Sequence, residues 1–157
     1  MTASKVAIAA LPLMLASFAA CEPETSAQAS SKCQLPEFSP TYLPWSKKKV
    51  GAPAKNVLHK RQAVVQWRGP SEGRRTPTLS LVSGAEIPDD IDAYETAPVR
   101  GVEGHVAWVG DPGVGELSLL WSEGETPCDA YGLHLFDRSL KKRRAEYEIK
   151  RIARSLK

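Results

Sequence analysis

Residues 116–136, ELSLLWSEGETPCDAYGLHLF, contain two apolar runs with a short turn between them. The runs at 116–122 and 131–136 have the length and the apolar and aromatic content of β-strands. Gly124 and Pro127 in the intervening segment are typical of turns. Parallel pairing needs a crossover of a dozen or more residues, so the shorter connection here predicts an antiparallel pair.

The same pattern extends toward the N-terminus as short apolar segments separated by Gly and Pro. Leu79 and Leu81 alternate with Thr78 and Ser80, which is the period of a half-buried strand. Residues 87–98 are acidic and flanked by proline, and they are predicted to form a long loop. The predicted upstream strands lie at 63–68, 76–83, 99–102 and 105–109. Short connections between them predict an antiparallel meander of about five strands.

The chain ends in a predicted helix that begins after Asp137 or Ser139, either of which can cap its N-terminus. Five apolar residues are spaced to fall on one side of this helix: Ala145, Ile149, Ile152, Ala153 and Leu156. A helix with one apolar face packs on a sheet with one apolar face. The predicted fold class is therefore α+β, a twisted antiparallel sheet covered by one C-terminal helix.

The segment 33–46, CQLPEFSPTYLPWS, precedes the predicted strands. Its three prolines oppose regular helix and favour an extended arm. We expect the apolar and aromatic residues of this arm to pack against the sheet. The chain of 157 residues is long enough for one domain with its own core, and this globular α+β domain is assigned to residues 33–157.

Residues 1–20 have the layout of an export signal. Lys5 precedes an uncharged apolar run, which ends in the small residues Ala19 and Ala20 directly before Cys21. This arrangement resembles a bacterial lipoprotein signal with its lipobox. The resemblance implies that a diacylglycerol, with acyl chains such as palmitate, is attached to the Cys21 sulfur and that the signal is cleaved before it. The alternative is an ordinary signal peptide and a soluble secreted product.

Residues 21–32 then comprise the lipidated cysteine and a flexible tether. The tether is small, polar and free of aromatic residues, as flexible linkers are. The apolar run of the signal is shorter than the ~20 residues that a membrane-spanning helix needs. We therefore expect an exported chain that is anchored by lipid to the extracytoplasmic face of the cell membrane.

The cysteine count supports this interpretation. Lipidation of Cys21 leaves two cysteines, Cys33 and Cys128. Disulfides persist in the compartments that exported proteins reach, so the remaining pair predicts one bridge. Two buried free thiols are the alternative.

Three short segments extend the resemblance to the folded part. They are 40–44 (PTYLP), 115–121 (GELSLLW) followed by Tyr131 and Gly132, and the ending 151–156 (RIARSL). In this order they resemble an extracytoplasmic domain family of unknown function, which occurs in Gram-positive lipoproteins and in the outer domains of some anti-sigma factors. The resemblance implies a fold and an extracytoplasmic location, with no catalytic residues to carry over.

Catalytic and metal-binding patterns are weak in this sequence. Ser122, His134 and Asp129 are the residue types of a hydrolase triad, but Ser122 lacks the Gly-x-Ser-x-Gly context. His134 alternates with Leu133 and Leu135, so it is expected on the other face of its strand. The three histidines stand in separate segments without the spacing of metal ligands. We therefore predict no enzymatic activity, no metal and no cofactor.

Two groups of residues are candidate binding surfaces. The five cations Arg138, Lys141, Lys142, Arg143 and Arg144 could contact anionic lipid headgroups or cell-wall polymer, or simply solvate a helix face. Trp67, Trp108 and Trp121 could line a groove for a lipid or another apolar ligand, or pack the core. The formal net charge of +3 does not by itself select a charged partner.

The predicted function is that of a non-enzymatic cell-envelope lipoprotein that binds an envelope protein or a ligand at the outer membrane face. Nucleic acid is not expected as a partner, because the chain is predicted to be exported. The alternatives are an envelope hydrolase or modifying enzyme with a dispersed site, and a lipid-binding carrier or sensor module. The hydrolase predicts a pocket with a nucleophile and titratable groups, whereas the carrier predicts an apolar cavity under residues 137–157.

Overall fold

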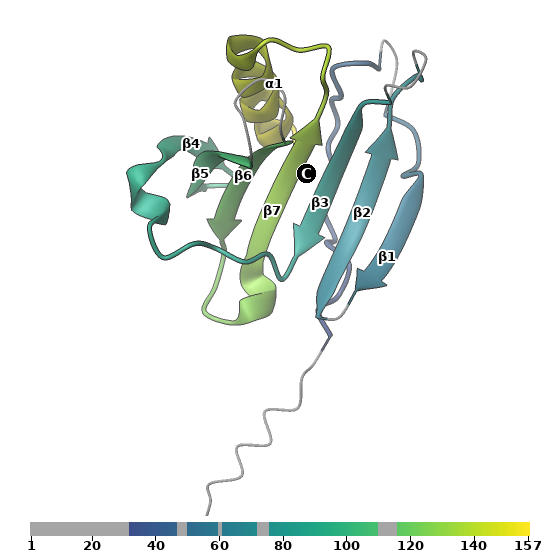
Figure 1. Ribbon diagram of the computed structural model, residues 1–157. Helices are drawn as coiled ribbons and strands as arrows, with labels where there is room; N and C mark the ends of the chain where they lie inside the picture. Colours follow the sequence, from purple (N-terminus) through teal and green to yellow (C-terminus); the bar gives the residue numbers. More distant parts are fainter. Residues whose placement is uncertain (1–31, 47–49, 60, 72–75, 110–115) are drawn as a thin grey trace, which may run out of the picture.

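A seven-stranded antiparallel sheet and one C-terminal helix form the fold in this computed structural model (Figure 1). The structure describes residues 32–46, 50–59, 61–71, 76–109 and 116–157. The predicted signal, Cys21 and the tether up to residue 31 lie outside these residues. The strands are β1 (Lys55–His59), β2 (Gln62–Arg68), β3 (Thr78–Ser83), β4 (Glu95–Val99), β5 (Val102–Val109), β6 (Glu116–Ser122) and β7 (Ala130–Phe136), and the helix is α1 (Lys142–Arg154).

The strand order across the sheet is β1-β2-β3-β7-β6-β5-β4, and every neighbouring pair is antiparallel. Consecutive strands are neighbours except at one point, where residues 84–94 carry the chain from β3 to the far edge of the sheet. This connection includes the short 3₁₀ helix Ile91–Ala93. It also packs Ala85 and Ile91 against Val82 and Leu120. The predicted simple meander is therefore interrupted by one crossing.

The prediction of about five strands is wrong in number, because the sheet has seven. The edge strand β1 was not predicted, and the segment 99–102 predicted as a strand contains the turn at Arg100 and Gly101 between β4 and β5. β1 has the sequence KNVLH, and β4 (ETAPV) begins inside the stretch predicted to be a loop. Pro98 in β4 argues against a central strand but is tolerated at a sheet edge, where one side of the backbone has no partner strand. The class α+β and the antiparallel pairing are confirmed.

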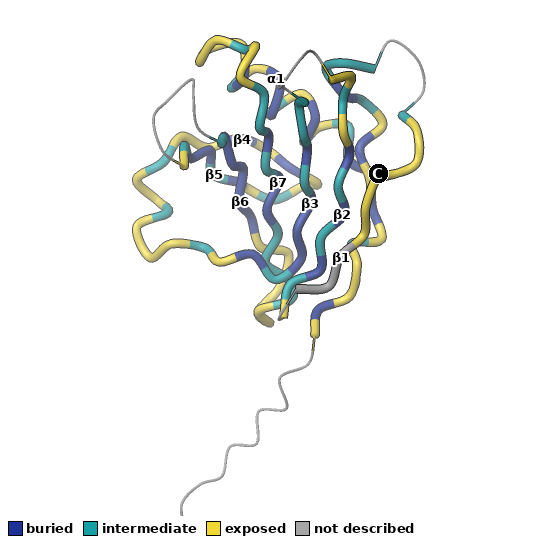
Figure 2. Tube along the Cα trace, turned by 45° about the vertical axis from the view of Figure 1, so that its right-hand side comes forward, coloured by how far each residue is buried: buried dark blue, intermediate teal, exposed yellow. Residues whose placement is uncertain are grey.

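One face of the sheet forms the core, together with α1. Alternate residues of the central strands are fully buried, among them Leu79 and Leu81 in β3 and Leu133 and Leu135 in β7. Figure 2 shows this burial concentrated along β3, β7 and β6. The apolar stripe predicted for the helix is confirmed, since Ala145, Ile149, Ile152 and Ala153 are buried in α1 and Leu156 is buried just beyond it.

The N-terminal arm covers the same face beside α1, as predicted. The arm and the C-terminal end of the chain exchange backbone hydrogen bonds, from Ser39 N to Lys157 O (3.0 Å) and from Lys157 N to Ser39 O (3.1 Å). The ring of Phe38 meets Tyr131 edge-on, at a centroid distance of 5.1 Å. Leu43 is also buried in the core. The arm and α1 therefore cover this sheet face together, whereas the sequence predicted that the helix would cover most of it.

The start of α1 differs from the prediction. Its N-cap position is Lys141, which makes no capping side-chain hydrogen bond, so neither Asp137 nor Ser139 caps the helix. Asp137 Oδ1 instead accepts hydrogen bonds from the backbone N–H (2.9 Å) and hydroxyl (2.6 Å) of Ser139, which closes the turn before the helix. The first turn of α1 contains no acidic residue. Cations there face the positive end of the helix dipole, which is unfavourable for an isolated helix.

The predicted disulfide between Cys33 and Cys128 is present. Cys128 lies in the short 3₁₀ helix Pro127–Asp129, immediately before β7. The backbone N–H of Cys33 donates to the carbonyl oxygen of Arg61 (2.8 Å), at the turn between β1 and β2. The bridge therefore fixes the beginning of the described chain to the end of the sheet at which β7 starts.

Candidate functional site

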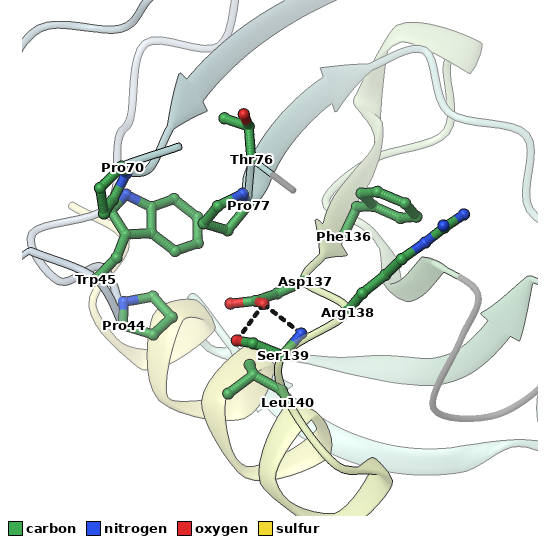
Figure 3. Close-up of a pocket in the computed structure, with 10 residues that line it drawn as sticks. All are labelled: Pro44, Trp45, Pro70, Thr76, Pro77, Phe136, Asp137, Arg138, Ser139 and Leu140. Carbon is green, nitrogen blue, oxygen red and sulfur yellow. Dashed lines mark hydrogen bonds between the residues drawn. The ribbon is translucent and has the colours of Figure 1, made fainter. Parts of the chain in front are cut away.

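An open cleft of about 780 Å³ lies at the other end of β7, where the chain turns toward α1 (Figure 3). It is lined by the end of the arm, by residues just after β2 and just before β3, and by the connection from β7 to α1. Figure 3 shows Trp45, Pro70 and Pro77 on one side, Phe136 and Arg138 on the other, and Asp137 and Ser139 between them. The volume falls in the range of small-molecule sites, which is ~300–1,000 Å³.

The position of Trp45 depends on a glycine. A Cβ atom added at Gly69 would lie 2.5 Å from Cγ of Pro77 and 2.8 Å from Cγ of Trp45. The backbone N–H of Gly69 also donates to the Pro77 carbonyl oxygen at 2.8 Å, which keeps these two segments together. Trp45 is therefore seated against the Gly69 backbone, and it remains only half-buried at the wall of the cleft.

The opposite wall combines an aromatic ring with a cation. The guanidinium carbon of Arg138 lies 5.1 Å from the centroid of the Phe136 ring, within the range of a cation–π contact. Asp137 is held by its two hydrogen bonds from Ser139. The cleft thus offers two aromatic side chains, a fixed carboxylate and a positive charge. Such a set can bind and orient a ligand with both apolar and polar faces.

Of the five predicted cations, Arg138 lies at this cleft and the other four lie at the start of α1. All five are exposed, and Arg138 lines the cleft itself. Arg144 is engaged in the fold, because it forms an ion pair with Glu148 and lies over the ring of Tyr147. Residues 138–144, RSLKKRR, contain no acidic residue. One of the predicted cations, Arg138, therefore borders a cleft that the sequence did not reveal, and the other four follow it in the chain.

The three predicted tryptophans are not brought together in an open groove. Trp67 and Trp121 are only 3% and 1% exposed and pack in the core. Trp121 Nε1 donates to Glu123 Oε1 at 3.0 Å. Trp108 is half-buried, and its Nε1 donates to Oε1 of Glu146 in α1 at 3.1 Å. The tryptophan that borders the cleft is Trp45, which the sequence assigned to packing of the arm.

A signal for Trp45 was present in the sequence. It follows Pro44 and precedes a run of serine and three lysines, so no strand or helix pattern is available to bury it. The prolines that flank it in space, Pro70 and Pro77, come from a different part of the chain. That juxtaposition depends on the pairing of β2 with β3 and could not be seen in the sequence.

The residue types of a hydrolase triad do not assemble around Ser122. Its hydroxyl donates to the carbonyl oxygens of Gly124 (2.7 Å) and Asp129 (3.4 Å). His134 lies elsewhere on the sheet, with its Nδ1 2.8 Å from the hydroxyl oxygen of Ser118 and 3.1 Å from Oε1 of Glu116. Both partners meet the same ring nitrogen, whereas a triad uses the two nitrogens for nucleophile and acid.

His134, Ser118 and Glu116 form a polar network on the sheet. The hydrogen bond from His134 holds the pKa of Glu116 below its ordinary value, while partial burial opposes that shift. Ser118 is 1% exposed, so its hydroxyl is closed to a substrate. Across the described residues, no three His, Cys, Asp or Glu side chains gather as metal ligands.

A smaller cleft, of about 490 Å³, lies near the disulfide. Two of its charges are paired within the fold: Arg100 Nε donates to Glu123 Oε1 at 2.7 Å, and the Arg100 guanidinium stacks 3.9 Å from the centroid of Phe38. Asp129 accepts hydrogen bonds from Thr126, and these lower its pKa. The smaller cleft also lacks a tryptophan in its lining, whereas Trp45 borders the larger one.

Comparison of the chain with protein-family models, with curated proteins and with solved structures gives no significant match. The resemblance to an extracytoplasmic lipoprotein family therefore stays a prediction. No helix in the described ranges has the length and apolarity that crossing a membrane requires.

Proposed function

We propose that this chain is an exported lipoprotein, anchored through Cys21 at the extracytoplasmic face of a membrane. Its folded domain binds an envelope ligand or protein and carries out no chemical reaction. The cleft bordered by Trp45 and Arg138 is the binding site in this proposal.

The disulfide is the observation that supports the proposal best. It joins Cys33 to Cys128, and such bonds persist in oxidising compartments outside the cytoplasm. The bridge uses two of the three cysteines and leaves Cys21 as the remaining cysteine. Two or three acyl chains on that one cysteine would give stable anchoring, whereas a single chain binds a membrane only marginally.

Metabolic labelling with palmitate and membrane fractionation test the anchor. Wild-type protein should take up label and stay with the membrane fraction. Cys21→Ser should lose the label and move to the soluble fraction, while the tether variant Ser26→Ala should behave as wild type. Unlabelled wild-type protein, or membrane association that survives Cys21→Ser, would contradict the proposal.

Co-purification tests the binding role. Protein extracted from its native membrane and analysed by mass spectrometry should retain a ligand or an envelope protein. The amount retained should fall in Trp45→Ala. It should stay unchanged in Trp108→Phe, which replaces a tryptophan that does not line the cleft. Equal retention by the two variants would place binding elsewhere on the molecule.

A further inference from the structure

We propose that the cleft and the cations beside it bind an acidic polysaccharide, with a sugar ring lying on Trp45 and acidic groups along Arg138, Lys141 and Lys142. This inference deepens the proposed function, on which it relies for the compartment in which the ligand is met. Three observations carry it: the composition of the cleft, the sign of the charge beside it, and its place relative to the start of the described chain.

The composition of the cleft suits a sugar ring. A pyranose has an apolar C–H face, which can lie on the electron-rich face of an aromatic ring, and hydroxyl groups at its edge. Trp45 supplies a half-buried indole at one wall, fixed by Gly69 and Pro77. Asp137 supplies a carboxylate at the base that can accept a hydrogen bond from a hydroxyl. The cleft is open rather than enclosed, so a polymer can enter and leave it.

The positive charge beside the cleft favours an acidic polysaccharide over a neutral one. Residues 138–144 contribute five exposed cations and no acid. Only Arg144 among these has a carboxylate partner in the described structure, namely Glu148. Lys141, Lys142 and Arg143 stand at the start of a helix that has no acidic residue in its first turn. Anionic groups at this position would offset both the mutual repulsion of the cations and the unfavourable helix dipole.

The position of the cleft favours a polysaccharide over a membrane surface as the partner. The described chain begins next to Cys33, at the end of the sheet where β7 starts, and the cleft lies where β7 ends (Figure 1). A strand of seven residues spans roughly 23 Å. A domain standing on its tether with this end toward the membrane would hold the cleft at its far end, and the vesicle probe below tests that arrangement.

Binding measurements with four probes test the inference. The full chain with Cys21→Ser is titrated by calorimetry with alginate (a polyuronate), dextran (a neutral glucan), polyphosphate (a polyanion without sugar rings) and phosphatidylglycerol–phosphatidylcholine vesicles. We expect binding to alginate that weakens as salt rises, since salt screens exposed charges. Dextran, polyphosphate and vesicles should each bind at least about tenfold more weakly, because each lacks one of the two recognised features.

Matched variants assign the binding to its two parts. Trp45→Ala should weaken alginate binding about tenfold, as loss of an interface tryptophan does, while Trp45→Phe should stay within about threefold of the parent. Lys141→Gln/Lys142→Gln should weaken binding and flatten its salt dependence. The charge-matched control Lys55→Gln/Arg154→Gln should leave both unchanged. Circular dichroism of every variant establishes that it is folded.

Three results would overturn the inference: equal affinity for alginate and polyphosphate, tighter binding to vesicles than to alginate, or unaltered alginate binding by folded Trp45→Ala. These results are independent of the anchor. Palmitate labelling of wild-type protein tests the proposed function without any glycan, and alginate binding by the Cys21→Ser chain tests the site without any lipid.

Discussion

The phenol oxygen of Tyr42 lies 2.7 Å from Oε2 of Glu148, a carboxylate that is fully buried in α1. The other carboxylate oxygen forms an ion pair with Arg144, and Arg151 donates to the Tyr42 oxygen from above its ring (3.2 Å). A buried charge is strongly destabilising unless it is paired and hydrogen-bonded. The N-terminal arm is therefore held to the helix by a polar network as well as by apolar packing.

Tyr42→Phe should destabilise the fold. The variant removes a hydrogen bond to a charged, buried group, so we expect the free energy of unfolding to fall by about 1.5–3 kcal/mol. Urea denaturation followed by circular dichroism measures the change. The exposed Tyr147→Phe is the matched control and should stay within about 0.5 kcal/mol of wild type. Equal effects of the two variants would mean that Glu148 does not depend on Tyr42.

The stability difference between wild type and Tyr42→Phe should shrink in alkali. Burial, followed by the hydrogen bond to Glu148, raises the pKa of Tyr42 above its ordinary value of 10.0. The folded protein then holds this proton more tightly than the unfolded chain does. The resulting stability is fully present below the unfolded pKa and is lost as pH rises through the folded one. Urea titrations from pH 8 to pH 11 test this, and a constant difference would contradict it.

Loss of the disulfide should destabilise the domain strongly. The bridge spans 95 residues of sequence, and a loop of that length contributes about 4–5 kcal/mol in the chain-entropy model. The double variant Cys33→Ser/Cys128→Ser should unfold at a correspondingly lower urea concentration. Reducing agent should lower the stability of wild type to that of the variant and leave the variant unchanged. A response of the variant to reductant would show that the effect is not due to this bond.

Gly69→Ala should disturb the cleft and the fold together. The added methyl group meets Pro77 and Trp45 at distances that require one of them to move. Overpacking of this kind costs about 1–3 kcal/mol, and displacement of Trp45 should also weaken ligand binding. Gly51→Ala is the control, because a Cβ there meets nothing within 4 Å. If the two variants are equally stable, Trp45 is not fixed by Gly69.

The core strands and the helix could be predicted because their patterns are local. Leu79, Leu81 and the stripe from Ala145 to Leu156 follow the periods of strand and helix, and burial follows from those periods. The edge strands β1 and β4 carry weaker patterns, since they have a partner on one side only. The cap of α1 was missed because Asp137 uses its side chain to close the preceding turn.

The candidate site was predicted only in part. The cations at 138–144 are contiguous in sequence, so their clustering was visible. The cleft depends on Trp45, Pro77 and Phe136, which are distant in sequence and meet only after β3 pairs with β2 and β7. Trp67 alternates with less buried residues in β2, whereas residues 117–121 of β6 are all buried, so alternation assigns Trp67 to the core but not Trp121. The sequence does not show which of its aromatic residues borders open space.

The disulfide also determines how the domain would carry mechanical load. Any pull on the chain at Lys32 reaches Cys33 first and passes through the covalent bridge into Cys128, two residues before the first residue of β7. A ligand bound in the cleft, as proposed above, would apply the opposing force at the other end of β7. Traction then runs along β7, whose hydrogen-bond ladders to β3 and β6 would be sheared as a set rather than peeled one bond at a time.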